Sequence, residues 1–292
     1  MSIDILQDKI RKLKNPSVVD MTASADKIPP CLMEKHGNFL AAYGEYCTNI
    51  MQALVQIVPA VRFRFANFSL YGPEGLALLE QLLKKAETMG FYVFLDCVQI
   101  FSPDMAQIAA DMLFAEDCRW HFHGLIATTY IGSDGLKPLI NKMASSNKSV
   151  FGVVRTGNKS AVEVQDLLCG GRLSHFAAAD VVNRLGVAMP GRCGYNLVGA
   201  VAGASSADSI RILRSKYPKV FMILDGYDYP NANTKNCSFA FDHFGFGAAA
   251  CACDSVMAAW IHAESDGTDY AQCAANVAQR MKIKLARYVT VL

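Results

Sequence analysis

The chain has 292 residues, of which 52% are hydrophobic and 18% are charged. That length is enough for one large domain with a well-buried core, and it is close to the roughly 250 residues of a typical α/β barrel. The formal net charge is only +2 and no basic block occurs, so we expect neither nucleic acid nor an anionic membrane as a partner, and a small-molecule site is the better default.

The composition also bears on compartment and cofactors. No apolar run reaches the roughly 18 residues of a membrane span, and residues 1–15 predict an amphipathic helix without the apolar region of a signal peptide, so a cytoplasmic protein is expected. The ten cysteines form no CxxC pair, and most are expected to be reduced and buried. Cys251 and Cys253 share a predicted strand face and could bind a soft metal, but no third ligand is evident, so we predict no metal and no cofactor.

Short apolar strands alternate with helical segments along the whole chain. The predicted strands, in chain order, are 17–21, 59–65, 91–96, 124–128, 150–155, 197–203, 220–225 and 246–252. Helices are predicted over the amino terminus, around 38–57, over 104–115 and over 72–90, where a proline near the start and a glycine at the end mark the bounds. About eight strands with helices between them predict a single-domain (β/α)8 TIM barrel over residues 1–292. An open doubly wound sheet is the alternative, but no Gly-x-Gly-x-x-Gly turn follows the first strand.

Function in such a barrel sits at the carboxyl ends of the strands. The third strand ends in Asp96, and Val98 points the same way because side chains alternate along a strand. The second strand ends in Arg62 and Arg64, which share a face. They either form a cationic floor that holds a carboxylate or phosphate, or make a structural ion pair with Asp96 or another acid.

The fifth and seventh strands also end in polar residues. Thr156 and Asn158, which follow Arg155, could hydrogen-bond a planar ligand or only cap a strand-to-helix turn. Gly226 permits close backbone approach, although the neighbouring carboxylates of residues 225 and 228 would repel an anion.

Two other features have readings that need no ligand. Asp254, after the eighth strand, would serve as a helix cap. His121 and His123 lie at the start of the fourth strand, opposite the active face, and are expected to be structural.

Several segments resemble the orotidine 5'-monophosphate decarboxylase family, in its longer bacterial subgroup, over nearly the whole chain. They are YGPEGL (71–76), YIGSDG (130–135), VRTGN (154–158) with QDL (165–167), and VGAVAGA (198–204). The resemblance implies a (β/α)8 barrel that forms a homodimer with active sites at the subunit interface.

The resemblance also implies where catalytic groups should be. The family's Lys, Asp, Lys, Asp array falls on Arg62, Asp96, Val98 and Phe101. Valine cannot donate a proton to a carbanion, and phenylalanine cannot hold a charge network. The family's phosphate-binding arginine falls on Asp254, and its seventh-strand loop loses the glutamine that touches phosphate. The first-strand G-L-D motif becomes residues 20–22 (DMT).

Three functional readings follow. The chain is a pseudoenzyme that binds protein, itself or an active relative, through a dimer face containing Phe101 and Met105. Alternatively, it binds or converts another small molecule, uncharged or cationic, through Arg62, Arg64 and Asp96. The third reading is an active decarboxylase that makes UMP in pyrimidine biosynthesis.

Overall fold

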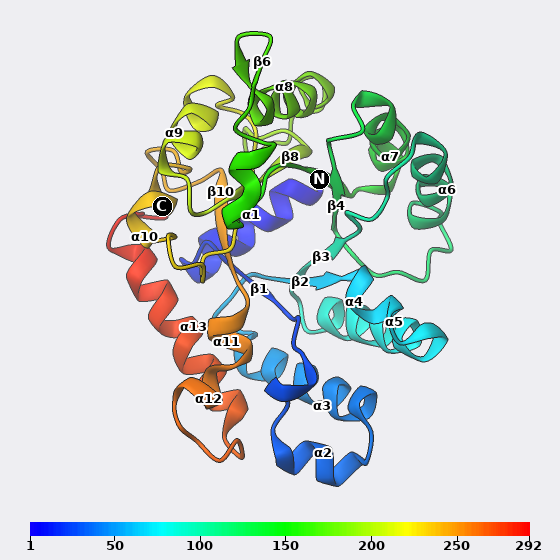
Figure 1. Ribbon diagram of the computed structural model, residues 1–292, viewed down its shortest axis with the longest axis vertical. Helices are drawn as coiled ribbons and strands as arrows, with labels where there is room; N and C mark the ends of the chain where they lie inside the picture. Colours follow the sequence, from blue (N-terminus) through cyan, green and yellow to red (C-terminus); the bar gives the residue numbers. More distant parts are fainter.

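The computed structural model describes residues 1–292 and shows eight parallel strands closed into a barrel (Figure 1). Around the barrel the strand order is β1-β10-β9-β8-β5-β4-β3-β2, and β1 closes the ring by pairing with both β10 and β2. The barrel strands are β1 (Ser17–Asp20), β2 (Ala60–Arg64), β3 (Tyr92–Asp96), β4 (Gly124–Thr128), β5 (Ser149–Arg155), β8 (Val198–Gly203), β9 (Met222–Asp225) and β10 (Ala248–Ala252). The predicted (β/α)8 barrel is confirmed, and each strand bound lies within two residues of its predicted place.

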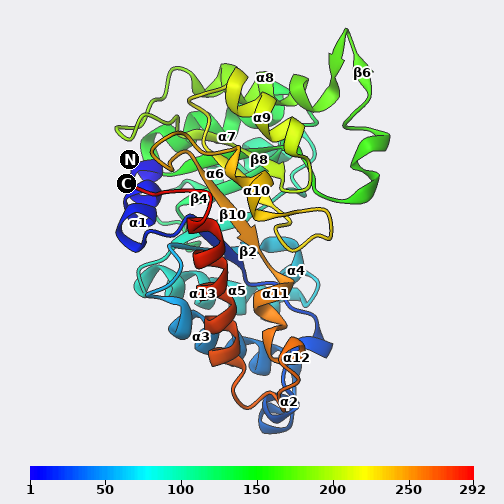
Figure 2. The ribbon, with the colours of Figure 1, turned by 90° about the vertical axis from the view of Figure 1, so that its left-hand side faces the viewer.

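Helices surround the barrel and one crosses its amino-terminal end. The helices are α1 (Ser2–Leu13), η1 (Ala25–Lys27), α2 (Pro30–His36), α3 (Phe39–Leu54), α4 (Phe65–Ser69), α5 (Gly72–Thr88), α6 (Pro103–Leu113), α7 (Ser133–Ser146), η2 (Lys159–Glu163), α8 (Ser174–Gly186), α9 (Ala207–Lys216), α10 (Thr234–Ser238), α11 (Asp254–Met257), α12 (Ala259–His262) and α13 (Tyr270–Ala286). Figure 2 shows α1 and both chain termini at one end of the molecule. None of these helices combines the length and apolar character that a bilayer-spanning segment needs.

Local signals explain where several helices begin and end. The Asn38 side chain accepts a hydrogen bond from the backbone N–H of Ala41 at 2.9 Å and so caps α3. Ser102 caps α6 in the same way, through the N–H of Met105 at 3.2 Å. The chain leaves α5 through Gly90, whose φ of 89° is a left-handed conformation that glycine adopts without strain.

The barrel interior is filled by aromatic rings that fit against glycines on neighbouring strands. The rings of Phe94 and Phe151 lie 5.2 Å apart, edge to face. A Cβ on Gly124 would stand 2.9 Å from the Phe94 ring, and one on Gly199 would stand 2.4 Å from the Phe151 ring. Large residues on some strands therefore require glycine on others, which fixes the strands relative to one another and supports the mouth above them.

The structure contains a β-hairpin that the sequence reading did not predict. Strands β6 (Leu168–Cys169) and β7 (Arg172–Leu173) pair antiparallel across a two-residue turn. Both turn residues have positive φ, 60° at Gly170 and 80° at Gly171, which is the requirement of a type I′ hairpin turn. The Gly-Gly pair was thus a readable signal. The hairpin projects at the end of the molecule opposite α1 (Figure 2).

Candidate functional site at the mouth of the barrel

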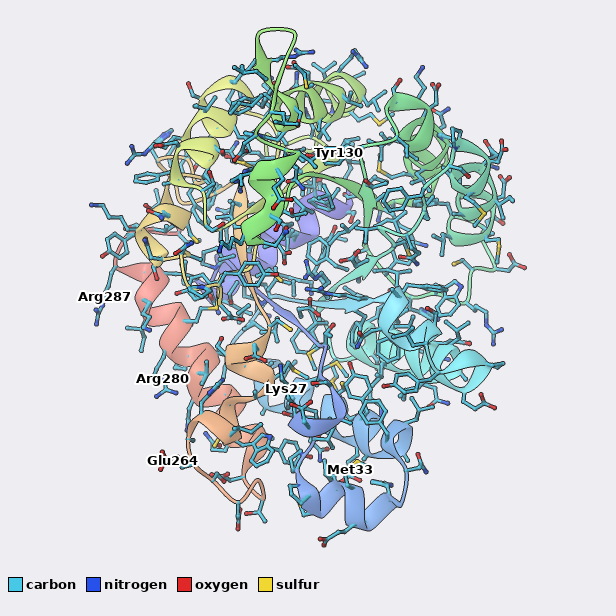
Figure 3. All side chains as sticks on the ribbon, viewed as in Figure 1. Lys27, Met33, Tyr130, Glu264, Arg280 and Arg287 are labelled. Carbon is cyan, nitrogen blue, oxygen red and sulfur yellow. The ribbon has the colours of Figure 1, made fainter.

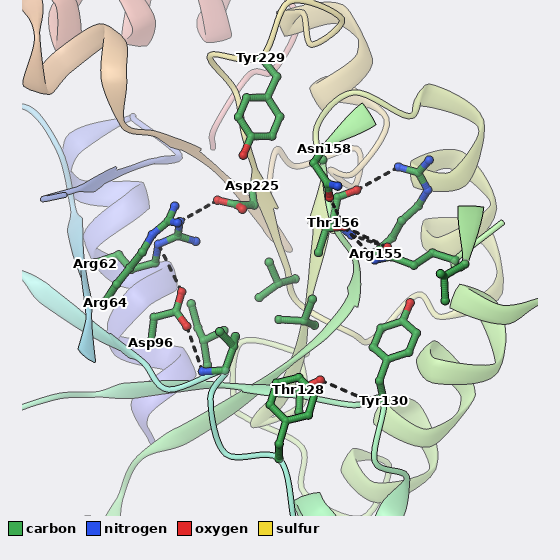
Figure 4. A pocket seen from close by; sticks show the side chains of 18 residues that line it. Arg62, Arg64, Asp96, Thr128, Tyr130, Arg155, Thr156, Asn158, Asp225 and Tyr229 are labelled. Carbon is green, nitrogen blue, oxygen red and sulfur yellow. Dashed lines mark hydrogen bonds and ion pairs between the residues drawn. The ribbon is translucent and has the colours of Figure 1, made fainter. Parts of the chain in front are cut away.

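A cavity of about 600 Å³ opens at the carboxyl ends of the strands, where a barrel carries its function. This volume is within the range of about 300 to 1,000 Å³ common for small-molecule sites. We call it the central cavity. Its lining is Arg62, Arg64, Asp96, Val98, Phe101, Ile126, Thr128, Tyr130, Val153, Arg155, Thr156, Gly157, Asn158, Val164, Gln165, Val201, Asp225 and Tyr229. Figure 4 shows the charged residues of β2, β3 and β9 on one side and the polar residues that follow β5 on the other.

The two arginines of β2 do lie on one face, but they bind a carboxylate of β1. Arg62 donates to Oδ2 of Asp20 from Nε at 2.9 Å and from Nη2 at 2.5 Å. Arg64 donates to the same oxygen from Nε at 2.7 Å. Because Asp20 is fully buried and Arg62 is 2% exposed, this pair belongs to the barrel interior.

Arg62 is also held by β9. Its Nη2 lies 2.9 Å from Oδ1 of Asp225, whereas its Nε is 3.9 Å from Oδ2 of Asp96. The ion pair expected for Arg62, with Asp96 or another acid, is present, and the main partners of the guanidinium are Asp20 and Asp225. Sequence order could not show this, because the end of β9 comes within reach of Arg62 only when the barrel closes.

The pKa values of the two buried acids of the cluster are shifted in opposite directions. Burial by itself would raise the pKa of Asp20, but Arg62 and Arg64 outweigh burial and lower it. Burial raises the pKa of Asp96, because the distant guanidinium groups offset the cost of desolvation only in part and two other carboxylates lie nearby. Asp96 thus takes up a proton more readily than Asp20.

Val98 and Phe101 both line the central cavity together with Asp96, but β3 ends at Asp96, so the turn after the strand and not strand alternation places Val98 there. They form its outer rim, with 36% of Val98 and 64% of Phe101 exposed. The backbone N–H of Val98 donates to Oδ1 of Asp96 at 3.3 Å, which fixes the turn after β3. Neither side chain can donate or accept a proton. The ionisable group nearest to Asp96 along the chain is the buried thiol of Cys97, whose pKa is raised by burial.

Thr156, Asn158 and Gln165 form the polar wall opposite the arginines. The Gln165 amide accepts from the backbone N–H of Thr156 at 2.7 Å and donates to its hydroxyl at 2.8 Å. That hydroxyl also donates to Oδ1 of Asn158 at 2.6 Å. These bonds hold the three side chains together at the cavity surface. Gln165 comes to this wall from beyond η2, which strand-end reasoning could not foresee.

Arg155 lines the cavity, but its charge is already neutralised. Its Nε and Nη2 donate to the two oxygens of Asp166 at 3.0 and 2.9 Å. Such a bidentate pair holds a guanidinium in a fixed orientation. The buried ring of His175 supports the same carboxylate, with Nδ1 3.1 Å from Oδ1 of Asp166. Arg155 therefore positions the loop after β5, and Thr156 and Asn158 are the residues free to meet a ligand.

A second cavity, of about 620 Å³, adjoins the first between the loops that follow β1, β2, β9 and β10; we call it the side cavity. Gly226 and Asp254 line it, and Asp254 forms an ion pair with Lys27. Figure 3 shows Lys27 and Tyr130 on opposite sides of the barrel. Asp254 is not the predicted helix cap, because it is the first residue of α11 and its side chain makes no capping bond. Asp228, from the β9 loop, accepts a hydrogen bond from the backbone N–H of Cys253, the residue before α11.

The remaining predicted candidates are two histidines at the other end of the barrel and two cysteines that line the side cavity. His121 and His123 are at the amino-terminal end of β4, where His121 Nδ1 lies 2.7 Å from a Glu87 oxygen. All ten cysteines are free. Cys251 is buried in β10, and Cys253 lies beyond that strand with its thiol donating to the Thr22 carbonyl at 3.4 Å. No group of three His, Cys, Asp or Glu side chains is placed to hold a metal ion.

Sequence and structure comparisons both find orotidine 5'-phosphate decarboxylases similar to this chain. No family model matches the chain. An orotidine 5'-phosphate decarboxylase of Petrotoga mobilis is 27% identical over 240 residues, 82% of each chain, and one of Rhodopirellula baltica is 29% identical over 212 residues, 71% of this chain and 70% of the relative. The chain resembles orotidine 5'-phosphate decarboxylases.

Solved structures of orotidine 5'-monophosphate decarboxylases share the fold. The enzyme of Leishmania donovani superposes with a TM-score of 0.70 at 22% identity, over 97% of this chain and 98% of that one. The enzyme of Plasmodium berghei gives 0.76 at 12% identity, over 97% and 98%. The fold of these decarboxylases therefore extends over almost the whole chain.

Proposed function

We propose that this chain is a cytoplasmic barrel of the orotidine 5'-phosphate decarboxylase type that binds a small molecule at its mouth and does not decarboxylate orotidine 5'-monophosphate. The observation that carries the proposal is the lining of the central cavity, whose 18 residues include no lysine. Its cations are three arginines, each held by a carboxylate. The ten free cysteines fit a reducing compartment.

The chemistry of the lining supports the absence of decarboxylation. A carbanion left by loss of CO2 needs a proton donor near its carbon, and Val98 occupies the place beside Asp96 where the family resemblance puts a lysine. An arginine is a poor substitute because its pKa lies far above neutral pH. Tyr130 is no better, because burial raises its pKa to about 12 and its hydroxyl donates to the Val154 carbonyl at 2.7 Å. Loss of a positioned acid forfeits about 10² to 10⁴ in rate.

The names of the relatives favour the competing function, an active decarboxylase that makes UMP. The two are separated by following the ultraviolet absorbance of orotidine 5'-monophosphate with purified protein. We expect no turnover. Turnover at an ordinary enzymatic rate, about 1 to 10³ s⁻¹, would show the proposal to be wrong. The Asp96→Asn variant is the control, since trace activity that it retains comes from a contaminating host enzyme.

Ligand binding is tested separately by thermal unfolding, because a ligand of the native state raises the melting temperature by mass action. Uridine and uridine 5'-monophosphate are the first probes. A shift with either one that is lost in a Thr156→Val, Asn158→Leu double variant supports a ligand site at the polar wall. An unchanged melting temperature with a broad set of nucleosides and nucleotides would leave the protein-binding reading as the better one.

The expected homodimer remains a proposal, and an exposed apolar face supports it. Phe101, Met105, Ile108 and Met112 recur at helical spacing along α6 and the turn before it, and each is more than half exposed. Ile108→Glu should shift the protein to monomer in light scattering coupled to gel filtration. Ile283→Glu on α13, at a similarly exposed isoleucine, should not. Equal behaviour of the two variants would place any dimer contact elsewhere.

A further inference from the structure

The central and side cavities are neighbours that meet at a partition. They share only Arg64, Asp225 and Tyr229 among their lining residues. Without those side chains they would form one long trough across the mouth, reaching from the polar wall after β5 to the turn after β10. A ligand that extended along such a trough would have to pass the partition, so the partition decides how long a ligand can be.

Tyr229 is built into the partition by two glycines. A Cβ on Gly157 would stand 2.9 Å from the Tyr229 ring, and one on Gly226 would stand 2.5 Å from it, so the ring lies directly on both backbones. The N–H of Tyr229 also donates to the Gly226 carbonyl at 3.0 Å. Figure 4 shows the ring projecting toward the cavity beside Asp225. Beneath it Asp225 is fixed by Arg62 at 2.9 Å, so the partition has a rigid base.

Beyond the partition, carboxylates of the chain itself already bind the groups that could hold an anion. Asp228 accepts hydrogen bonds at 2.5 Å from the backbone N–H of Cys253 and at 2.5 Å from the hydroxyl of Ser255. The side cavity's lysine, Lys27, is paired with Asp254. A phosphate that reached this place would meet three carboxylates, at positions 225, 228 and 254, and would find its hydrogen-bond donors taken.

We propose that Tyr229 and Asp228 restrict the mouth to an uncharged heterocyclic ligand without a phosphate group, held in the central cavity alone. This inference rests on the proposed function, since it specifies the ligand of the same site. The central cavity suits such a ligand, because apolar side chains such as Ile126, Val153 and Val201 can contact a ring while Thr156 and Asn158 meet its polar edge. Tyr229 limits its length and Asp228 excludes an anionic tail.

The test compares binding of uridine and of uridine 5'-monophosphate by calorimetry. The wild-type protein should bind uridine at least tenfold more tightly than uridine 5'-monophosphate. A Tyr229→Ala, Asp228→Ser double variant should gain at least tenfold in affinity for the monophosphate, because the partition and the competing carboxylate are both removed. Tyr227→Phe, a tyrosine change in the same loop, is the matched control and should leave the preference unchanged.

Asp228→Asn guards against a double variant that does not fold, because the amide oxygen can still accept from Cys253 while the charge is gone. It should raise monophosphate affinity severalfold. If the wild-type protein bound both probes equally, the inference would be wrong but the proposed ligand site would still be supported. The same conclusion would follow from a folded variant that kept the wild-type preference for uridine. Binding of neither probe to any variant would overturn the inference together with the proposed ligand site. The inference would be supported if the variants bound uridine 5'-monophosphate and the wild-type protein did not.

Discussion

Asp20→Asn and Asp96→Asn should change stability in different directions, although both acids lie beside Arg62. Replacing Asp20 leaves a guanidinium that is 2% exposed without its principal partner. Removing one partner of a buried ion pair costs about 3 to 5 kcal/mol. Asp225 remains 2.9 Å away and still neutralises part of the charge, so the lower end, about 3 kcal/mol, applies. The bond to the half-exposed Arg64 adds at most about 1 kcal/mol.

Asp96 is not a principal partner of the Arg62 guanidinium. Its carboxylate is 3.9 Å from Arg62 and accepts only a 3.3 Å bond from the N–H of Val98. Burial raises its pKa, which means that the folded state disfavours the ionised form. An asparagine of the same shape removes that penalty. Asp96→Asn should therefore be as stable as the wild type at pH 7, or more stable.

Thermal and urea unfolding followed by circular dichroism measure the contrast. A loss of about 3 kcal/mol in Asp20→Asn corresponds to a fall of roughly 6 to 12 °C in melting temperature, using about 2 to 4 °C per kcal/mol. If Asp96→Asn lost as much stability as Asp20→Asn, the assignment of Asp20 as the principal partner of Arg62 would be wrong, and Asp96 would contribute as much to holding the guanidinium.

The pH dependence adds a second check with a definite sign. Asp96 has a raised pKa, so its contribution to stability is present below the ordinary carboxyl pKa and is lost as pH rises through the raised value. Any advantage of Asp96→Asn should therefore shrink as pH falls from 7 into the acid range. Asp20 has a lowered pKa, so its contribution is present above the ordinary carboxyl pKa and is lost only as pH falls through the lowered value. A growing advantage of Asp96→Asn on acidification would refute the assigned direction.

Three other substitutions test the frame of the mouth. Gly203→Ala should cost about 1 to 3 kcal/mol in urea unfolding, because its Cβ would stand 2.7 Å from the Cα of Gly157, and a cost near zero would contradict that close contact. Asp166→Asn should abolish ligand-induced thermal shifts as well as lower the melting temperature, because it frees Arg155 to move; an unchanged ligand shift would show that the loop after β5 is held otherwise. Lys27→Gln should change stability by less than about 1 kcal/mol, since its pair is partly exposed, and a larger loss would mean that the pair is more shielded than it looks.

The scaffold could be predicted from the sequence because strand and helix signals are local. Apolar runs of strand length alternate with capped amphipathic helices, and their order is enough to predict a (β/α)8 barrel. The same reasoning missed the β6–β7 hairpin, where the short strands have too few residues for a pattern and only Gly170-Gly171 signals the turn.

The candidate site was predicted in part. Arg62, Arg64, Asp96, Thr156 and Asn158 were singled out as strand-end residues, and the structure places all five in one cavity. Their partners were not predictable in the same way. Contacts within a turn, such as Val98 with Asp96, depend on neighbours in sequence, whereas contacts between strand ends depend on how the barrel closes.

The barrel, the residues at its mouth, and the valine and phenylalanine near Asp96 can all be inferred from the amino-acid sequence. Tertiary structure alone decided which charges neutralise one another, because β1 meets β2 and the end of β9 comes within reach of Arg62 only in the closed barrel. It also decided that Tyr229 divides the mouth, since the Tyr229 ring rests on Gly226 in its own loop and on Gly157, which is far away in the chain. Electrostatic and steric interactions act through space over a few ångströms, and the spacing of residues along the chain does not reveal those distances.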